Sequence, residues 1–482
     1  MINANFKKEL LKKFNYTPTK EQDFAIDKIT EFLYDKNPFS AFLLKGYAGT
    51  GKTSLVGAFV ETVEKMGGKC VLMAPTGRAA KVMTRYSEHQ AFTIHKIIFR
   101  QKRFGLDLDF ALGFNSRTNV IFVVDEASMI SDKGDERTAS ESLLSSLMSF
   151  IYGNGRGCRL LIVGDEAQLP PIAETESPAL NRDVLSKYGL DIRQAMLTEV
   201  VRQEDISGVL WNATNIRLLL DKGNFNVLPK VRFKGFADVR NITGDILIET
   251  LTDCYQHDGM DETIVVCRSN KRANIYNNGI RAQILWRESM IESQDLVMVA
   301  KNNYYWTEQE GNARKEDADE MKGMDFIANG EVAVIRRVRN VRELYGFSFA
   351  DWSLEFPDYD DYEIEATVLL DALQSQAPAL TQEQQETLFK RVEEDYLDVP
   401  TKEERMKKIR QDAYFNALQV KYAYAVTCHK AQGGQWTNVF IDQGYLPEDT
   451  AGKDYYRWLY TAMTRATNRL FFVNWKEDQT EI

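Results

Sequence analysis

The stretch Ala41-Phe-Leu-Leu-Lys45-Gly46-Tyr-Ala-Gly-Thr-Gly-Lys52-Thr53 carries three local signals in a row. Its apolar beginning predicts a short buried strand, and the apolar periodicity of Thr53–Met66 predicts a helix. The loop between them matches the pattern GxxxxGK[ST]. Glycines allow the backbone N–H groups of such a loop to face a phosphate, and the N-terminus of the following helix favours an anion. This order of strand, loop and helix indicates an α/β domain that binds a phosphorylated ligand.

The loop also predicts which atoms would hold ATP and Mg²⁺. The Lys52 ammonium can reach the β- and γ-phosphates, and the Thr53 hydroxyl can bind Mg²⁺. The positions expected to contact the nucleotide are Gly46, Gly49, Thr50, Gly51, Lys52, Thr53 and Ser54.

Two further apolar strands end in polar side chains. Val120–Val124 is followed by Asp125 and Glu126, and the run Leu161-Ile-Val-Gly164-Asp165 leads to Gln168. Ligands bind at the carboxyl ends of parallel strands, so we expect Asp125 to hold Mg²⁺ and Glu126 to polarise the attacking water. Gln168 could contact both the γ-phosphate and a moving element. For the two carboxylates, the alternative is a solvated strand end.

Apolar runs rich in β-branched residues recur along the chain and predict parallel strands in two α/β domains. They are Ala41–Lys45, Cys70–Ala74, Val120–Val124, Leu160–Val163, Thr263–Val266, Val439–Ile441 and Leu470–Val473. The interval 291–418 differs, because its short alternating segments Asp295–Val299, Glu331–Arg337 and Glu363–Leu369 predict a small β-barrel. The capping patterns Thr381–Gln384 and Thr401–Glu404 predict two helices that project from this barrel.

Net charge, cysteine spacing and the length of apolar runs limit the kinds of partner and site that the chain can have. The 482 residues carry a net charge of −10, but residues 1–100 hold 16 Lys/Arg against 9 Asp/Glu, while residues 351–400 hold 2 against 14. Binding depends on the local field, so the total charge does not exclude nucleic acid. The five cysteines are scattered without a CxxC pair, which favours a reducing cytoplasm over disulfides or a zinc site. No apolar run is long enough to cross a membrane, and we expect no membrane-spanning segment and no membrane partner.

Six ordered segments resemble the motifs of the superfamily 1 helicases, and in detail those of the 1B branch with its RecD-like, Pif-like and phage Dda-like members. They are the glycine-rich loop, VVDEASM, GDEAQLPPI, LTEVVRQ, TCHKAQGGQ and TAMTRA. The resemblance covers about Tyr16 to Asn474, and the layout is most similar to the Dda type. It implies RecA-like domain 1A at 1–195, with a pin (1B) at about 98–118. Domain 2A would comprise 196–290 and 419–482. The interval 291–418 would be domain 2B, an SH3-like barrel with a helical projection at 381–418.

The resemblance also implies residue roles. Gln22 would recognise the adenine edge, Arg202 and Arg465 would approach the γ-phosphate from the second domain, and Gln432 and Gly433 would contact the nucleotide. The contacts to single-stranded DNA would come from Pro75, Thr76, Arg78, Thr93 and His95 in the first domain and from Thr427, His429 and Lys430 in the second. Phe104 or Phe110 in the pin could wedge a duplex junction, or equally pack beneath their own loop. Gln435 departs from the family pattern, which has Glu there.

These features together imply an ATP-driven DNA helicase that acts as a monomer on single strands and duplex junctions, in a bacterial or phage-encoded cytoplasmic setting. By resemblance, travel would be 5′→3′. The rivals are an RNA or RNA–DNA hybrid helicase, a P-loop ATPase that remodels protein complexes, and a non-enzymatic helicase-like subunit. The acidic stretch 351–400 could dock a protein partner, although a solvated surface is the plainer interpretation.

Overall fold

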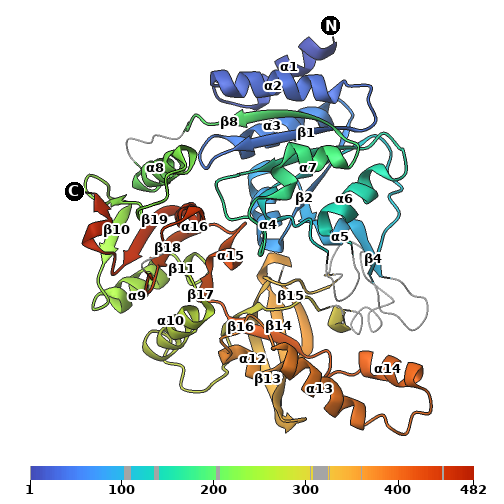
Figure 1. Cartoon of the computed structure of the whole chain (residues 1–482), viewed down its shortest axis with the longest axis vertical. Coiled ribbons are helices and arrows are strands. Elements are labelled where there is room, and N and C mark those ends of the chain that lie inside the picture. Colours follow the sequence, from blue (N-terminus) through green and yellow to red (C-terminus); the bar gives the residue numbers. More distant parts are fainter. Residues whose placement is uncertain are drawn as a thin grey trace.

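The computed structural model describes residues 2–101, 110–134, 141–201, 207–303, 305–307, 324, 326–359, 361–447 and 450–481. Two parallel sheets and a closed barrel are arranged around a common centre (Figure 1). The α/β class expected from the sequence is confirmed, and each strand predicted above lies within an observed strand or within one residue of it.

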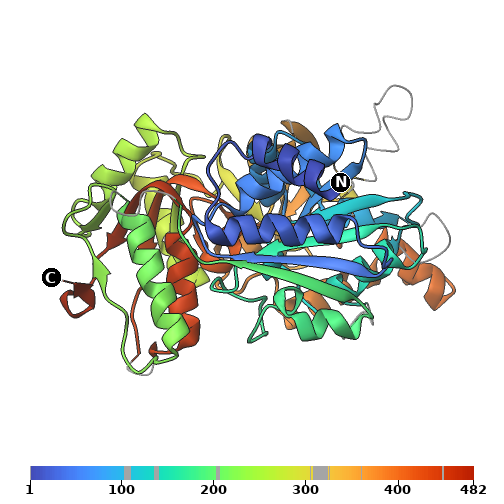
Figure 2. The same ribbon diagram turned by 90° about the horizontal axis from the view of Figure 1, so that it is seen from above.

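The first sheet is six-stranded and entirely parallel, in the order β3-β2-β6-β7-β1-β8. Its strands are β1 (Ser40–Gly46), β2 (Lys69–Ala74), β3 (Ala91–Thr93), β6 (Val120–Val124), β7 (Arg159–Gly164) and β8 (Asp191–Leu197). Helices α1 (Ile2–Lys13), α2 (Lys20–Leu33), α3 (Lys52–Lys65) and α4 (Gly77–Ser87) share one core with the sheet. Helices α5 (Ile94–Ile98), α6 (Leu143–Tyr152) and α7 (Arg182–Lys187) share a second core on the other face. Figure 2 shows helices on both sides of these strands.

The second sheet is also parallel, with the order β10-β19-β18-β11-β17. Its strands are β10 (Val239–Ile242), β11 (Thr263–Cys267), β17 (Ala425–Thr427), β18 (Trp436–Asp442) and β19 (Ala466–Val473). Around it lie α8 (Gly208–Lys222), α9 (Leu247–His257), α10 (Asn270–Gln283), α15 (Cys428–Ala431) and α16 (Lys453–Met463). A short pair joins β9 (Val231–Arg232) to β20 (Thr480–Glu481). Figure 2 shows α8 and α16 side by side.

The barrel consists of β12 (Leu296–Val299), β13 (Val332–Leu344), β14 (Phe347–Phe356), β15 (Tyr362–Leu369) and β16 (Leu418–Tyr422). Between β15 and β16 the chain forms α12 (Asp371–Gln374) and the two predicted helices, α13 (Gln382–Glu394) and α14 (Lys402–Arg410). Thr381 caps α13 with a full capping box, and Thr401 caps α14 by accepting a hydrogen bond from the Glu404 amide. The projection has its own apolar cluster, which contains Leu388, Val392 and Ile409.

Two of the expected domain boundaries differ from the strand pairing. The first sheet extends through β8 to Leu197, so a boundary at 195/196 falls inside that strand. The barrel is closed by β16, so residues 419–422 pair within the barrel and not with the second sheet. Sequence patterning missed this because β16 is a short alternating run directly before the strand β17.

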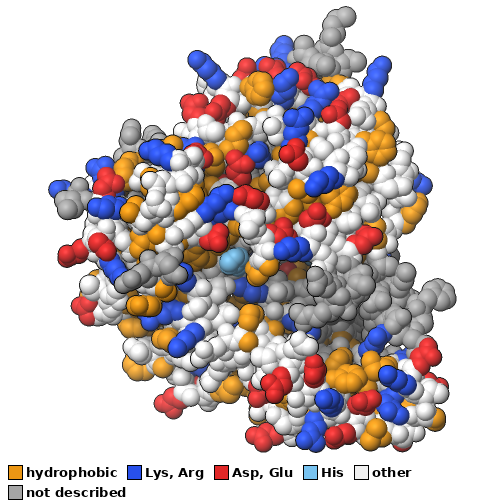
Figure 3. Space-filling model, viewed as in Figure 1, with side chains coloured by type: hydrophobic (Ala, Val, Ile, Leu, Met, Phe, Trp, Pro, Cys, Tyr) orange, Lys and Arg blue, Asp and Glu red, His pale blue; other side chains and the backbone are white. Residues whose placement is uncertain are grey.

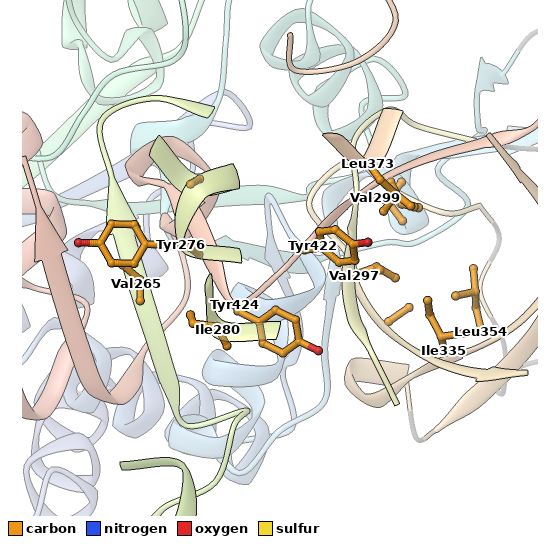
Figure 4. Close-up of a cluster of buried hydrophobic side chains, with 14 of the residues drawn as sticks. Val265, Tyr276, Ile280, Val297, Val299, Ile335, Leu354, Leu373, Tyr422 and Tyr424 are labelled. Carbon is orange, nitrogen blue, oxygen red and sulfur yellow. The ribbon is translucent and has the colours of Figure 1, made fainter. Parts of the chain in front are cut away.

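The barrel and the second sheet share one hydrophobic core. Val265 of β11 and Tyr276 of α10 belong to the same buried cluster as Val297 and Leu354 of the barrel. Figure 4 shows Tyr422 and Tyr424 between the two groups of side chains. A buried ion pair strengthens the junction, because Arg281 of α10 makes two hydrogen bonds to Asp295, at 3.0 and 2.9 Å. The barrel is therefore anchored to the second domain.

A short antiparallel pair, β4 (Phe99–Gln101) with β5 (Phe110–Leu112), stands where the pin was expected. Phe104 lies outside the described residues, and only the backbone of Phe110 is described, paired with Gln101. Their role as a wedge stays a prediction. In the part of the chain that the structure describes, no helix is long and apolar enough to span a membrane.

Candidate nucleotide-binding cleft and nucleic-acid track

The glycine-rich loop lies between β1 and α3, as the sequence predicts. Lys52, the first residue of α3, donates from Nζ to the carbonyl oxygens of Gly46 and Tyr47, each at 2.7 Å. These bonds hold its ammonium inside the loop. The Thr50 hydroxyl is buried and donates to the Tyr47 carbonyl at 2.8 Å. Thr53 and exposed Ser54 follow Lys52 in the first turn of α3 and line the adjoining cavity.

Gln22 fastens α2 to this loop. Its side-chain oxygen accepts from the Thr19 amide, and its Nε2 donates to the Thr50 carbonyl, both at 3.0 Å. Gly51 has a left-handed φ of 82°, and a Cβ there would lie 2.7 Å from Gln22 Nε2, so only glycine fits. Gln22 thus shapes the loop directly, and recognition of adenine by it stays a prediction.

Asp125 and Glu126 follow β6 at the carboxyl edge of the sheet. The Asp125 carboxylate accepts a hydrogen bond from the Glu126 amide at 2.8 Å. Desolvation of the Asp125 carboxylate and the neighbouring Glu126 charge raise its pKa to about 6, while the Glu126 amide and Lys52 partly offset the shift. Glu126 has a left-handed φ of 52°, a strained conformation that is concentrated at functional sites. The Asp125 carboxylate and the Thr53 hydroxyl are oxygen donors of the kind that Mg²⁺ prefers.

The loop after β7 adds Asp165 and Gln168, both buried. Asp165 accepts from the Ala167 amide at 2.9 Å, and its pKa is raised by burial. The side-chain oxygen of Gln168 is buried and has no hydrogen-bond partner among the described residues. An unpaired buried acceptor is costly, which is consistent with a group that acts on a ligand or a moving neighbour.

Arg465 brings the second domain to these carboxylates. It precedes β19 and is buried, with Nε donating to the Thr461 carbonyl at 3.0 Å and Nη1 to the Gly434 carbonyl at 3.2 Å. The same Nη1 lies 4.0 Å from Glu126 Oε1. The guanidinium is therefore held by its own domain and faces the first domain. Arg202, the second predicted arginine, lies outside the described residues.

Tyr460 forms a bridge that sequence reasoning missed. Its hydroxyl accepts from the Ala48 amide in the glycine-rich loop at 2.9 Å and donates to Asp165 Oδ2 at 2.6 Å. The next residue, Thr461, accepts from the Leu169 amide at 2.9 Å. Their position in the sequence could have indicated this, because Tyr460 directly precedes the segment TAMTRA and Thr461 is its first residue.

Gln432 adds a further bond between the domains, from its Nε2 to the Leu169 carbonyl at 2.7 Å. Gly433 lies against Thr76 and Ala79 of the first domain. Both positions were expected to contact the nucleotide, but in this structure their contacts are with the other domain.

A cavity of about 340 Å³ opens beside the glycine-rich loop. Lys52, Thr53, Gln22 and Tyr16 line it from the first domain, and Gln435, Thr464 and Thr467 line it from the second. Closure or opening between the domains must therefore change its walls.

The predicted nucleic-acid contacts gather where the two sheets meet the barrel. Thr76 caps α4, and Thr93 caps α5. Burial lowers the pKa of His95 to about 4, so its imidazole is neutral at neutral pH. Thr427, His429 and Lys430 lie at the start of α15, and burial lowers the pKa of Lys430 to about 8.

Arg78 is already engaged between the domains. Its guanidinium lies 4.1 Å from the centre of the Trp436 ring and donates to the carbonyl oxygens of Asp261 and Gln435, each at 3.3 Å. No described contact distinguishes Pro75. The roles of these residues in nucleic-acid binding stay predictions.

Comparison with known proteins agrees with this geometry. Residues 20–219 match the family model of an AAA domain, and residues 422–473 match that of the UvrD-like helicase C-terminal domain. An uncharacterized protein of Acanthamoeba polyphaga mimivirus is 22% identical over 519 residues, covering 94% of this chain and 99% of that protein. The ATP-dependent DNA helicase dda of Enterobacteria phage T4 is 28% identical over 259 residues, 50% of this chain and 52% of the relative.

Two further similarities are shorter or weaker. The ATP-dependent RecD2 DNA helicase of Deinococcus radiodurans is 29% identical over 136 residues, 27% of this chain and 16% of that protein. The structure of a Bacteroides Pif1 helicase in complex with ADP-AlF3 and ssDNA is 15% identical, covers 97% of this chain and 95% of that one, and has a TM-score of 0.44. The ordered motifs, the two matched family models and the similarity to the phage T4 DNA helicase support an ATP-driven helicase of the superfamily 1B type.

Proposed function

We propose that this helicase moves along single-stranded DNA in the 5′→3′ direction and unwinds duplex DNA. The observation that carries the motor part of this proposal is the approach of Arg465 Nη1 to 4.0 Å from Glu126 Oε1 between two parallel-sheet domains. A cation from one domain that faces the hydrolytic carboxylate of the other couples nucleotide state to the distance between the domains. Alternate gripping by the two domains converts that coupling into movement along a strand.

The hydrolytic roles follow from the positions described above. Lys52 would neutralise the β- and γ-phosphates, Glu126 would polarise the attacking water, and Arg465 would stabilise charge that develops on the γ-phosphate. Mg²⁺, held by Thr53 and Asp125, would supply further neutralisation of the phosphates. Gln168 would link the γ-phosphate to the second domain, since its neighbour Leu169 hydrogen-bonds to that domain on both sides. Arg202 would supply a second cation.

The polarity and the DNA substrate rest on the resemblance to the 1B branch. The relatives named DNA helicases support DNA over RNA. A monomeric motor in a cytoplasmic setting is part of the proposal, and the free thiols of Cys70, Cys158, Cys254, Cys267 and Cys428 are consistent with a reducing compartment.

A protein partner at residues 351–400 has less support. Two carboxylates of this stretch are paired within the barrel, Asp351 with Arg342 and Glu355 with Arg336. In Figure 3, acidic and basic side chains are interspersed over the visible face of the barrel and its helices.

The test is ATP hydrolysis with and without single-stranded DNA, for the wild type and Lys52→Ala, together with unwinding of duplexes that carry a 5′ or a 3′ tail. We expect DNA-stimulated hydrolysis that is lost in Lys52→Ala, and unwinding from the 5′ tail only. Unwinding from the 3′ tail alone would refute the polarity. Stimulation by RNA and not by DNA would favour the RNA helicase. Hydrolysis indifferent to both would favour a protein-remodelling ATPase.

A further inference from the structure

One short segment of the barrel lies against the predicted nucleic-acid contacts of both domains. The residues Phe326–Glu331 lead into β13, and we call them the barrel plug. The Phe326 ring lies 5.4 Å from the His95 ring, centre to centre. Asn329 accepts a hydrogen bond from the Lys430 ammonium. Glu331 accepts one from the Gly77 amide at 3.2 Å. In Figure 1 the barrel meets α4 and lies beside α15 at this point.

The Glu331 carboxyl group lies at the N-terminus of α4, where an anion is favoured. Its side chain is buried, with the residue 3% exposed, and it also accepts from the Tyr359 hydroxyl at 2.8 Å. The N-terminus of an 11-residue helix favours a negative group, and free amides there are common ligands of phosphate. A second contact holds the same surfaces together, since Lys81 of α4 pairs with Asp358 at 3.2 Å.

The sequence of α4 accommodates this carboxylate. A Cβ on Gly77 would lie 2.5 Å from Glu331 Oε2 and 2.7 Å from Oε1, closer than atoms can approach. The backbone of Gly77 is helical, so no left-handed conformation requires glycine there. Glycine at this position is therefore explained by the approach of Glu331.

We propose that the barrel plug occupies the single-strand track of the free protein, with the Glu331 carboxylate in the place of a backbone phosphate, and that a nucleic-acid strand must displace it to bind. This inference rests on the proposed function. The plug engages the first domain through Gly77 and His95 and the second through Lys430. Entry of a strand and movement of the barrel are then a single event.

The ionisation of Glu331 favours displacement of the barrel plug by a nucleic-acid strand. Burial and the nearby Asp358 charge raise the pKa of Glu331 to about 8, so at neutral pH the buried carboxyl group is held mostly in its protonated, neutral form. Release into water allows the Glu331 side chain to ionise, while a phosphodiester that replaces it keeps its charge at neutral pH. Displacement thus replaces a mostly protonated carboxyl group by a permanent anion at the same helix N-terminus.

The test compares the affinity of the full-length protein for a fluorescent oligothymidylate, measured by anisotropy at fixed salt. Glu331→Ala removes the carboxylate, and Gly77→Ala expels it sterically without changing it. The control is Glu355→Ala, which removes a barrel carboxylate that pairs with Arg336 of the same barrel. The competent fraction sets the apparent affinity, so both plug variants should bind on the order of tenfold more tightly than wild type, with the control unchanged.

The outcomes separate the two proposals. If the wild type binds the strand tightly and its ATP hydrolysis is stimulated by DNA, weaker or unchanged binding in Glu331→Ala would overturn the plug proposal and leave the helicase proposal intact. Failure of the wild type and of every variant to bind the strand would overturn the proposed function, and the plug with it. Weakened binding in Gly77→Ala alone, with tighter binding in Glu331→Ala, would support the plug and add a direct contribution from the amide at position 77.

Discussion

The hydroxyl of Tyr460 offers the sharpest test of how the domains communicate. Tyr460→Phe leaves the aromatic ring in place but removes both of its hydrogen bonds, to the Ala48 amide and to the buried Asp165 carboxylate. An unpaired buried amide costs about 1–3 kcal/mol, and a lost bond to a charged group about 1.5–3 kcal/mol. Partial compensation by water leaves about 2–4 kcal/mol against the arrangement that brings Arg465 to Glu126.

The assay is steady-state ATP hydrolysis at saturating single-stranded DNA. Every 1.4 kcal/mol is about tenfold in an equilibrium constant, so even 2 kcal/mol disfavours the closed cleft roughly 30-fold. We expect kcat to fall by about tenfold or more, in proportion to the smaller closed population.

Tyr456→Phe is the matched control, because it removes a hydroxyl from the same helix. Its hydroxyl donates to the Val227 carbonyl at 2.8 Å within the second domain, so hydrolysis should stay near wild type. Thermal unfolding of both variants shows whether either is generally destabilised. Equal kcat values for the two variants, or wild-type kcat in Tyr460→Phe, would refute the bridge as a coupling element.

Three further predictions follow from the contacts described. Arg465→Lys cannot reproduce the guanidinium fork, and hydrolysis should fall by on the order of 10³-fold in a DNA-stimulated assay, with nucleotide binding retained. Asp295→Ala leaves Arg281 buried without its partner and should lower the free energy of unfolding by about 3–5 kcal/mol in a denaturant titration, whereas a loss under 1 kcal/mol would contradict the ion pair's role. Because the pKa of Glu331 is raised, the folded state binds a proton more tightly than the unfolded chain does. The stability of the wild type relative to Glu331→Gln should therefore fall as pH rises from about 5 to about 9. Parallel curves of melting temperature against pH for the two proteins would refute this.

Much of the nucleotide site could be predicted from local sequence. Lys52, Asp125 and Glu126 each follow or precede a buried strand, and parallel strands carry such residues to one edge wherever the sheet forms. Gly51 was predictable in the same way, because the glycine of the GxxxxGK[ST] pattern reflects the backbone conformation of the loop itself. Each of these motifs is short, so it can be recognised without knowing how the rest of the chain folds.

The contacts between domains could not be predicted in this way. Tyr460 meets Asp165 across 295 positions, and Glu331 meets Gly77 across 254, so no local periodicity reports either pair. Counting charges along the sequence could not find these pairings either, since the arginines that pair with Asp351 and Glu355 lie outside residues 351–400.

The sequence by itself determined the two α/β domains, the phosphate loop and the acidic strand end, because each depends on neighbouring residues and on backbone geometry. Only the tertiary structure decided that Gln22 braces the loop, that Tyr460 and Gln432 join the domains, and that a barrel carboxylate covers Gly77. A side chain's partner depends on where distant strands are placed, and that placement is set by the packing of whole cores and not by any short stretch of residues.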